Sequence, residues 1–222
     1  MELIFNEHGL TVKTLSSRDE LEAAFRLRHD VFSRELGWVP CAVNGMESDA
    51  YDPFSVSIGV FDLDECIVGY LRITPSPNPF MVEKEFSILL PERAKIKKGP
   101  DVAEVTRLCV RRENRNSQLM ANVANLLYKG LYHWNLGSGV RYSLMVVDNR
   151  CYRLLRLTGL PVEANGRFHT MPDGVKAACC TLDWRAFEQG ARERKPGFYN
   201  WMATVPVRYS SLSLSHELYL QH

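Results

Sequence analysis

The strongest constraint on the fold is the alternation of strand-like and helix-like segments in the second half of the chain. Apolar runs rich in β-branched residues predict strands at about 102–110, 140–147 and 178–184. Between the first two strands, Asn116 or Ser117 caps a strongly apolar helix that ends at Gly137. Asp148 begins a second helix, which ends at Gly159. This alternation predicts an α/β fold, with a mixed sheet flanked by helices on both faces.

The first half of the chain has a different pattern, one helix followed by a hairpin. A capping box that begins at Ser17, followed by apolar residues at helical spacing, predicts a helix over about 17–36. Two segments rich in β-branched and aromatic residues, 56–63 and 66–73, predict an antiparallel hairpin. The polar stretch 38–53, between helix and hairpin, is expected to be a long loop.

Nothing in the sequence divides the chain into parts. No repeat or linker interrupts it, so we expect one domain over residues 1–222, in which about 195–222 form a C-terminal extension without an interpretation. The apolar content of 45% is enough for a sizeable core. The formal net charge of +1 provides no field for a polyanion, which argues against a nucleic-acid partner. We expect a monomer.

The sequence also lacks the signs of a membrane or secreted protein. No apolar run approaches the roughly 20 residues that span a bilayer, and the N-terminal segment lacks the basic region of a secretory signal. The 6 cysteines are scattered, with no CxxC pair and no histidine partners at zinc spacing. We therefore expect a reduced, cytoplasmic protein with no membrane contact and no structural metal.

A dense group of carboxylates marks the predicted loop before the hairpin. Glu47, Asp49 and Asp52 lie close together in the sequence, accompanied by the aromatic residues Trp38 and Tyr51. Carboxylates and aromatic faces both supply negative potential to a positive ligand, so the group suits an organic cation. The alternative is a solvated acidic loop that simply follows an amphipathic helix.

Two charged residues, Glu104 and Arg107, interrupt the apolar strand at 102–110. Burying either charge without a partner would cost several kcal/mol, so the strand predicts a functional site or an ion pair between Arg107 and an acid. Residues three apart on a regular strand point to opposite faces. Both side chains can therefore reach one cleft only through a local bulge or twist. Arg72, at the end of the hairpin, would project into whatever the acidic loop encloses.

An ordered series of motifs runs through the first half of the chain. It consists of RxxxF at Arg28 and Phe32, Trp38, ExDxYD from Glu47 to Asp52, Arg72 in GxLRxxP, Phe86, and ExxR at Glu104 and Arg107. The series covers about residues 25–110, half of the chain, and the later segment RLLRLTGLP continues it more loosely. In this order and spacing it resembles the LuxI-type acyl-homoserine lactone synthases, or autoinducer synthases.

The resemblance implies a GNAT-like acyltransferase fold, whose splayed mixed sheet admits an acyl-pantetheine arm. It also implies a reaction in which an acyl group passes from acyl-carrier protein or acyl-coenzyme A to the amine of S-adenosylmethionine. Lactone closure then releases methylthioadenosine, and the product is a quorum-sensing signal. S-adenosylmethionine would be a co-substrate, and no cofactor would be bound permanently.

Eight residues fall on the family's functional positions. The resemblance places four around S-adenosylmethionine, namely Arg28, Phe32, Trp38 and Arg72. It places four in catalysis, namely Asp49, Asp52, Glu104 and Arg107. We expect Glu104 to be the general base, because burial in an apolar strand would raise its pKa toward the pH of the reaction. Arg28 and Asp49 should be replaceable without loss of the fold, since they lie at a helix end and in a loop.

The acyl group needs a tunnel and a route of delivery. Phe86, Met145 and Val147 are expected to line the tunnel, although simple core packing is an alternative. Two basic clusters would dock an acidic acyl-carrier protein, namely Lys97 with Lys98, and Arg111 with Arg112 and Arg115. The alternative for these clusters is that they are solvated loop charges.

Two other functions compete with lactone synthesis. A general GNAT N-acyltransferase that uses acyl-coenzyme A would hold pyrophosphate on a glycine-bearing loop, whereas the segment RRENRNSQLM offers arginines and a helix start but no GxG. A non-catalytic module that binds S-adenosylmethionine or a carrier protein would bind the same ligands without turnover. Release of methylthioadenosine separates an enzyme from such a module.

Overall fold

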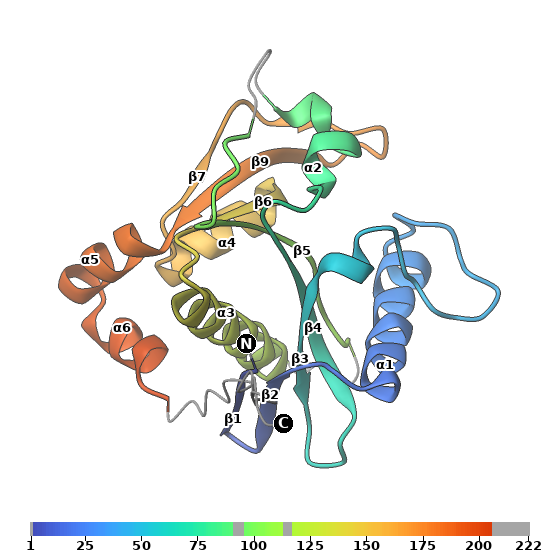
Figure 1. Ribbon diagram of the computed structural model, residues 1–222, viewed down its shortest axis with the longest axis horizontal. Coiled ribbons are helices and arrows are strands. Elements are labelled where there is room, and N and C mark those ends of the chain that lie inside the picture. The colour runs from blue at the N-terminus through green and yellow to red at the C-terminus, as the bar shows by residue number, and fades with distance from the viewer. Residues whose placement is uncertain (1, 91–95, 113–116, 206–222) are drawn as a thin grey trace, which may run out of the picture.

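The computed structural model describes residues 2–90, 96–112 and 117–205, and shows an α/β fold built on a central sheet (Figure 1). Across these residues the strand order is β1-β2-β3-β4-β5-β6-β9-β7, and β8 pairs with β9. All neighbouring strands are antiparallel except β5 and β6, which are parallel. The mixed sheet expected from the sequence is therefore confirmed.

The elements have the following bounds. The strands are β1 (Ile4–Glu7), β2 (Leu10–Thr14), β3 (Val56–Phe61), β4 (Ile67–Pro75), β5 (Val102–Val110), β6 (Tyr142–Asp148), β7 (Val162–Ala164), β8 (His169–Thr170) and β9 (Lys176–Asp183). The α-helices are α1 (Arg18–Arg28), α2 (Met81–Lys84), α3 (Ser117–Ser138), α4 (Asn149–Thr158), α5 (Trp184–Arg194) and α6 (Pro196–Ala203). A π-helical segment, η1 (His29–Glu35), and two 3-10 turns, η2 (Asp52–Phe54) and η3 (Ser87–Leu89), complete them.

The sheet has a back face, covered by α3, and a front face, which carries α1 and α2 (Figure 1). Successive residues of a strand point to opposite faces. On β4, for example, Leu71 and Ile73 belong to the large apolar core under α3, whereas Tyr70 belongs to a smaller front core under α1. A second front core, around Phe80 and Leu89, lies under α2 and η3. Arg72 points to the front, as Tyr70 does two residues earlier.

The sheet is splayed between β5 and β6. Their parallel pairing covers only 102–105 on one strand and 142–145 on the other. Beyond this point β5 stays paired with β4 as far as Val110, while β6 stays paired with β9 as far as Asp148. The two halves of the sheet therefore separate from the middle of the molecule onward, as the family resemblance implies.

The first predicted helix is confirmed in extent, but its second part is π-helical. Ser17 accepts a hydrogen bond from the backbone N–H of Glu20 (3.2 Å), and the Glu20 carboxylate accepts from the N–H of Ser17 (3.1 Å), which completes the capping box. From His29 the backbone changes to the wider i to i+5 pattern. Short π segments of this kind are frequent at functional sites, and this one carries Phe32.

The β1–β2 hairpin and α6 are among the elements that the sequence does not predict. The β1–β2 hairpin turns at His8 and Gly9, both of which have positive φ, as a two-residue hairpin turn requires. Helix α6 packs against α3, where the buried Lys129 donates a hydrogen bond to Glu7 (2.7 Å) and lies over the ring of Trp201 (4.4 Å). This contact gives structure to residues 196–203 of the C-terminal segment.

The described part of the chain has neither a helix that could cross a membrane nor a cluster of metal-binding side chains. None of the described helices has both the length and the apolarity needed to cross a bilayer. Within the described ranges no group of three or more histidine, cysteine, aspartate or glutamate side chains is arranged to hold a metal ion.

The contact between β4 and α3 should be sensitive to one added methyl group. A Cβ at Gly69 would meet Val123 Cγ1 at 2.5 Å and Leu127 Cδ1 at 3.3 Å. We expect Gly69→Ala to lower the free energy of unfolding by about 1–3 kcal/mol through overpacking, measured by urea denaturation. Gly197→Ala is the matched control, because its Cβ would meet nothing within 4 Å; equal stabilities of the two variants would contradict the packing described here.

Candidate active site

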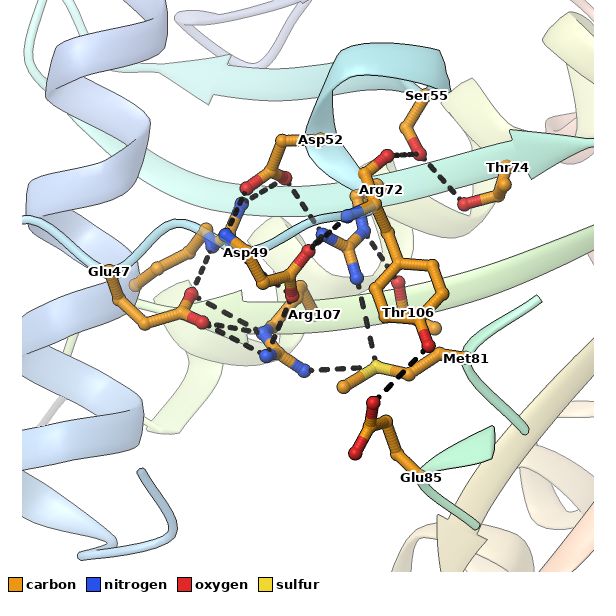
Figure 2. A network of polar contacts seen from close by, with 12 residues as sticks. Glu47, Asp49, Asp52, Ser55, Arg72, Thr74, Met81, Glu85, Thr106 and Arg107 are labelled. Carbon is orange, nitrogen blue, oxygen red and sulfur yellow. Dashed lines mark hydrogen bonds and ion pairs between the residues drawn. The ribbon is translucent and has the colours of Figure 1, made fainter. Parts of the chain in front are cut away.

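A buried network of arginines and carboxylates occupies the front face of the sheet, between the two front cores (Figure 2). Three separate elements supply the arginines: α1, β4 and β5. One loop, between η1 and η2, and the first residue of η2 supply the carboxylates. The members are Arg28, Arg72, Arg107, Glu47, Asp49 and Asp52. The acidic loop is therefore not a solvated one, since its carboxylates are paired with arginines of the scaffold.

Arg28 is completely buried at the end of α1. Its Nε donates to Glu47 and its Nη1 donates to Asp52 (2.6 Å), while the Nη2 atom has no hydrogen-bond partner. The premise that truncation of Arg28 opens no cavity is wrong, because the side chain is fully buried. Its removal would leave a cavity and take one of two arginine partners from Glu47 and from Asp52.

Arg72 and Arg107 complete the network from adjacent strands. Arg72 donates through Nη1 to Asp49 and to Asp52 (2.8 Å), and through Nε to Thr106 (2.9 Å). Arg107 donates through Nη2 to Glu47 and Asp49, at 2.9 Å in each case. Every carboxylate of the network thus contacts at least two arginines, so removing one side chain affects several pairs.

A β-bulge on β5 explains how Arg107 reaches the front face. Tyr70 pairs with Cys109 and Arg72 pairs with Thr106, so two residues of β5 lie opposite the single residue between Tyr70 and Arg72. Arg107 is one of the two, and its φ of 56° is in the left-handed region. The bulge that the sequence requires, if Glu104 and Arg107 are to share one face, is confirmed.

The network lowers the pKa of two of its carboxylates, those of Glu47 and Asp49. Burial is the largest influence on the pKa of Glu47 and acts to raise it, but hydrogen bonds from Arg28 and Arg107 outweigh burial and lower the pKa. The pKa of Asp49 is likewise lowered, because the contacts with Arg72 and Arg107 exceed the effect of burial. Both groups therefore stay ionised at neutral pH and bind their arginines as carboxylates.

Glu104 lies beside the network but has different partners. Its side chain is buried on the front face, and its two oxygens accept the backbone N–H groups of Met81 (2.6 Å) and Val82 (2.8 Å) at the start of α2. Burial raises the pKa of Glu104, and the two backbone hydrogen bonds and Arg72 offset this only in part. Among the carboxylates described around the site, Glu104 thus combines burial with a raised pKa.

Aromatic side chains border the network. Phe32 stacks on Trp38 with ring centroids 6.2 Å apart, and Trp38 is 48% exposed. The guanidinium of Arg107 lies over the Phe32 ring (5.6 Å), and that of Arg72 lies over the Tyr51 ring (5.6 Å). The exposed indole of Trp38, stacked on the buried Phe32 ring next to buried charges, is a suitable surface for a flat, partly cationic ligand.

The structure adds site residues to which the sequence analysis assigns no role. Tyr70 accepts from or donates to Ser57 (2.9 Å), and the Tyr51 hydroxyl donates to Glu85 (3.4 Å). The sulfur of Met81 lies against two of the arginines (Figure 2). Tyr70 could have been found from its place two residues before Arg72, because such residues share a face of a strand. Met81 has no comparable signal in the sequence.

The three expected tunnel residues do not face one space. Phe86 packs in the front core with Leu144 and Val146, whereas Met145 and Val147 belong to the back core. Leu144 and Val146 point to the front and Met145 and Val147 to the back, because neighbouring residues of β6 alternate between faces. Their assignment to a tunnel stays a prediction, in which Phe86 is separated from the other two by the sheet.

The two basic clusters lie at opposite ends of β5. Lys97 and Lys98 precede this nine-residue strand, and Arg111 and Arg112 follow it, which separates them by roughly 30 Å. Lys98 is engaged beside α2, where it pairs with Glu83 and donates to the carbonyl of Asn78 (2.8 Å). Lys97 and Arg112 are exposed. Arg115 lies outside the described residues.

Comparisons with known proteins bear on the family and the fold of this chain. The model of the autoinducer synthase family matches residues 12–184, most of the chain. This chain belongs to the autoinducer synthase family. An acyl-homoserine-lactone synthase of Agrobacterium fabrum is 29% identical over 189 residues, which cover 82% of this chain and 87% of that protein. The family and the acyltransferase class expected from the motifs are confirmed.

Solved structures show the same fold. The acyl-homoserine-lactone synthase LasI matches with a TM-score of 0.71 at 19% identity, over 79% of this chain and 90% of that one. BjaI, described as a coenzyme-A-dependent synthase in complex with S-adenosylmethionine and isopentyl-coenzyme A, also matches with a TM-score of 0.71, at 22% identity over 91% and 90%. The acyltransferase fold that the resemblance implies is therefore confirmed.

The buried network should stabilise the autoinducer synthase fold as well as shape its site. We expect Arg28→Ala to lower the free energy of unfolding by about 3–5 kcal/mol, because Glu47 and Asp52 lose their shared cation in a buried place. Arg34→Ala is the control, since Arg34 is 66% exposed and pairs with Asp30 at the surface; it should cost less than about 1 kcal/mol. Chemical denaturation of both variants measures the difference, and similar losses would refute a structural role of Arg28.

Proposed function

We propose that this chain makes an acyl-homoserine lactone from a thioester-bound acyl group and S-adenosylmethionine. The observation that carries the proposal is the buried arginine–carboxylate network, which lies beside Glu104 and the exposed Trp38 on the front face. Membership of the autoinducer synthase family supports it. Residues Arg28, Phe32, Trp38 and Arg72 are assigned to binding of S-adenosylmethionine, and Asp49, Asp52, Glu104 and Arg107 to catalysis.

The charge of the site suits this substrate. The three arginines and three carboxylates of the network balance, and an ionised Glu104 adds one negative charge. S-adenosylmethionine carries a sulfonium, an ammonium and a carboxylate, so its net charge is positive. Acids attract the two cationic groups, Trp38 offers a face to the adenosine portion, and guanidinium groups suit the carboxylate.

The reaction requires two substitutions. Glu104 takes a proton from the ammonium group, and the free amine attacks the thioester carbonyl, which expels the thiol and forms an amide. The carboxylate oxygen of the same substrate then attacks the carbon next to the sulfonium, which closes the lactone and releases methylthioadenosine. The second step is intramolecular and is favoured when the substrate is held in a folded conformation. No covalent bond to the protein is formed.

The acyl chain is proposed to cross the sheet where β5 and β6 separate. Their pairing ends at Val105 and Met145, so no backbone hydrogen bonds close the sheet between them beyond this point. A thioester carbonyl held on the front face could then extend its acyl chain toward the back core beside Met145 and Val147. Phe86 would contact the front part of the substrate instead.

Replacement of Glu104 tests its role as the base. Glu104→Gln should reduce release of methylthioadenosine by at least about 10²-fold, because the amide cannot take the proton. It should leave binding of S-adenosylmethionine within about tenfold. Since both oxygens of Glu104 accept backbone N–H groups, the amide NH₂ of glutamine would oppose one donor, so folding must be checked by circular dichroism.

Glu85→Gln is the control for this test, because Glu85 lies nearby, is 45% exposed and contacts Tyr51. It should keep most activity. A folded Glu104→Gln enzyme with nearly full kcat would rule out Glu104 as the base.

The two faces of β6 give a matched test of the acyl path. Met145→Ala should shift the product toward longer or bulkier acyl chains, because it adds space on the back face. Leu144→Ala removes a similar volume from the front core and should leave the preference unchanged. Mass spectrometry of the lactones from competing acyl donors measures the profile; a shift with Leu144→Ala alone would place the acyl chain on the opposite face.

Docking of an acyl-carrier protein is proposed for the exposed cations that flank β5. Arg112→Glu and Lys97→Glu are tested separately, because the two positions are too far apart to form one patch. At least one should raise the KM for an acyl-carrier substrate more than tenfold, while the KM for the same acyl group on pantetheine changes little. Arg194→Glu on α5 is the control charge reversal. Equal effects on both donors would exclude docking at these residues.

A further inference from the structure

The sulfur of Met81 lies where two guanidinium groups converge (Figure 2). Nη2 of Arg72 is 3.7 Å from the sulfur, and Nη1 of Arg107 is 3.4 Å from it. The other polar contacts of these two arginines go to oxygen: Nε and Nη1 of Arg72 donate to Thr106 and the aspartates, and Nε and Nη2 of Arg107 donate to Glu47 and Asp49. Each arginine therefore directs its one remaining terminal nitrogen at the same thioether.

A thioether is a poor partner for two cations. Methionine sulfur is only a weak hydrogen-bond acceptor, whereas a carboxylate forms short, charge-assisted hydrogen bonds with guanidinium groups. Arg72 is fully buried, the Arg107 side chain is 11% exposed and Met81 is 8% exposed, so bulk water has little access to the two donors. The two N–H groups are consequently underused in the ligand-free protein, and an incoming carboxylate would gain most of the binding energy that they can supply.

The side chain of Met81 can leave this position without disturbing the helix that carries it. Its backbone N–H is fixed by Glu104 at the start of α2. The unbranched side chain has three rotatable bonds and adapts readily to new surroundings. A carboxylate could therefore replace the sulfur while the backbone of α2 stays in place.

We propose that the Met81 thioether is a placeholder for the substrate carboxylate, which displaces it and binds between Arg72 and Arg107. This inference rests on the proposed function, because S-adenosylmethionine supplies the carboxylate. Methylthioadenosine, the leaving group, keeps the adenosine and the sulfur but has no carboxylate. Met81 would return to the arginines after the lactone has closed, since closure removes the negative charge from the substrate.

The test compares the two ligands on the full chain labelled with ¹³C at its methionine methyl groups. The Met81 signal is assigned by its loss in Met81→Leu, a substitution that conserves volume. We expect S-adenosylmethionine to shift this signal at least three times as far as methylthioadenosine does, at saturation with each ligand. The Met145 signal, from the back core, is the internal control and should respond to neither.

The affinities of Met81→Leu for the two ligands provide a second test. Their ratio would not change if the Met81 side chain had only a structural role. Leucine accepts no hydrogen bond, so the free protein loses a partner for both donors. The ratio of the affinities for S-adenosylmethionine and methylthioadenosine, measured by calorimetry, should therefore rise at least threefold.

Four outcomes would overturn this role. Equal shifts of the Met81 signal with both ligands, or an unshifted signal in the complex with S-adenosylmethionine, would overturn the placeholder while leaving the proposed function intact. An unchanged affinity ratio in Met81→Leu would do the same. Failure of the wild-type protein to bind either ligand would overturn the proposed function and this role together.

Discussion

The pairing of three buried arginines with three carboxylates is the interaction on which the site depends. Charges of this kind cannot be buried singly, because each would lose its hydration without compensation. Their mutual hydrogen bonds make burial possible and fix the loop that carries Glu47, Asp49 and Asp52 against the sheet. The same pairing leaves some guanidinium nitrogens without an oxygen partner, and these become available to a ligand. Stability and recognition thus come from one set of side chains.

The two faces of the sheet differ in the kind of side chain that they bury. The back face buries apolar side chains under α3 and α6 and has no ionisable group of the network. The front face holds the network between two small apolar cores, which limit the access of water to it. The proposed acyl path, beyond the point where β5 and β6 cease to pair, would connect the two environments. A substrate with a charged head and an apolar tail matches this division, because each part meets surroundings of its own polarity.

The sequence predicts the elements that have a strong periodic pattern and misses those that depend on distant contacts. The hairpin at β3–β4, the strand β5 and the helix α3 follow from local patterns. Helix α6 does not, because its stability comes from the packing of Trp201 against Lys129, far away in the chain. Within the site, the charged residues stand out against an apolar strand or cluster in a loop. Met81 does not stand out, because its contact with two arginines exists only in three dimensions.

The acids of the network come from one short segment, whereas its arginines come from α1, β4 and β5. During folding, the segment cannot complete its ion pairs until all three of these elements have docked together. A partly folded chain, in which any one of them is missing, would leave at least two of the carboxylates with one arginine partner fewer. Formation of the site is therefore coupled to completion of the fold. Partly folded chains of this enzyme should consequently not catalyse lactone formation.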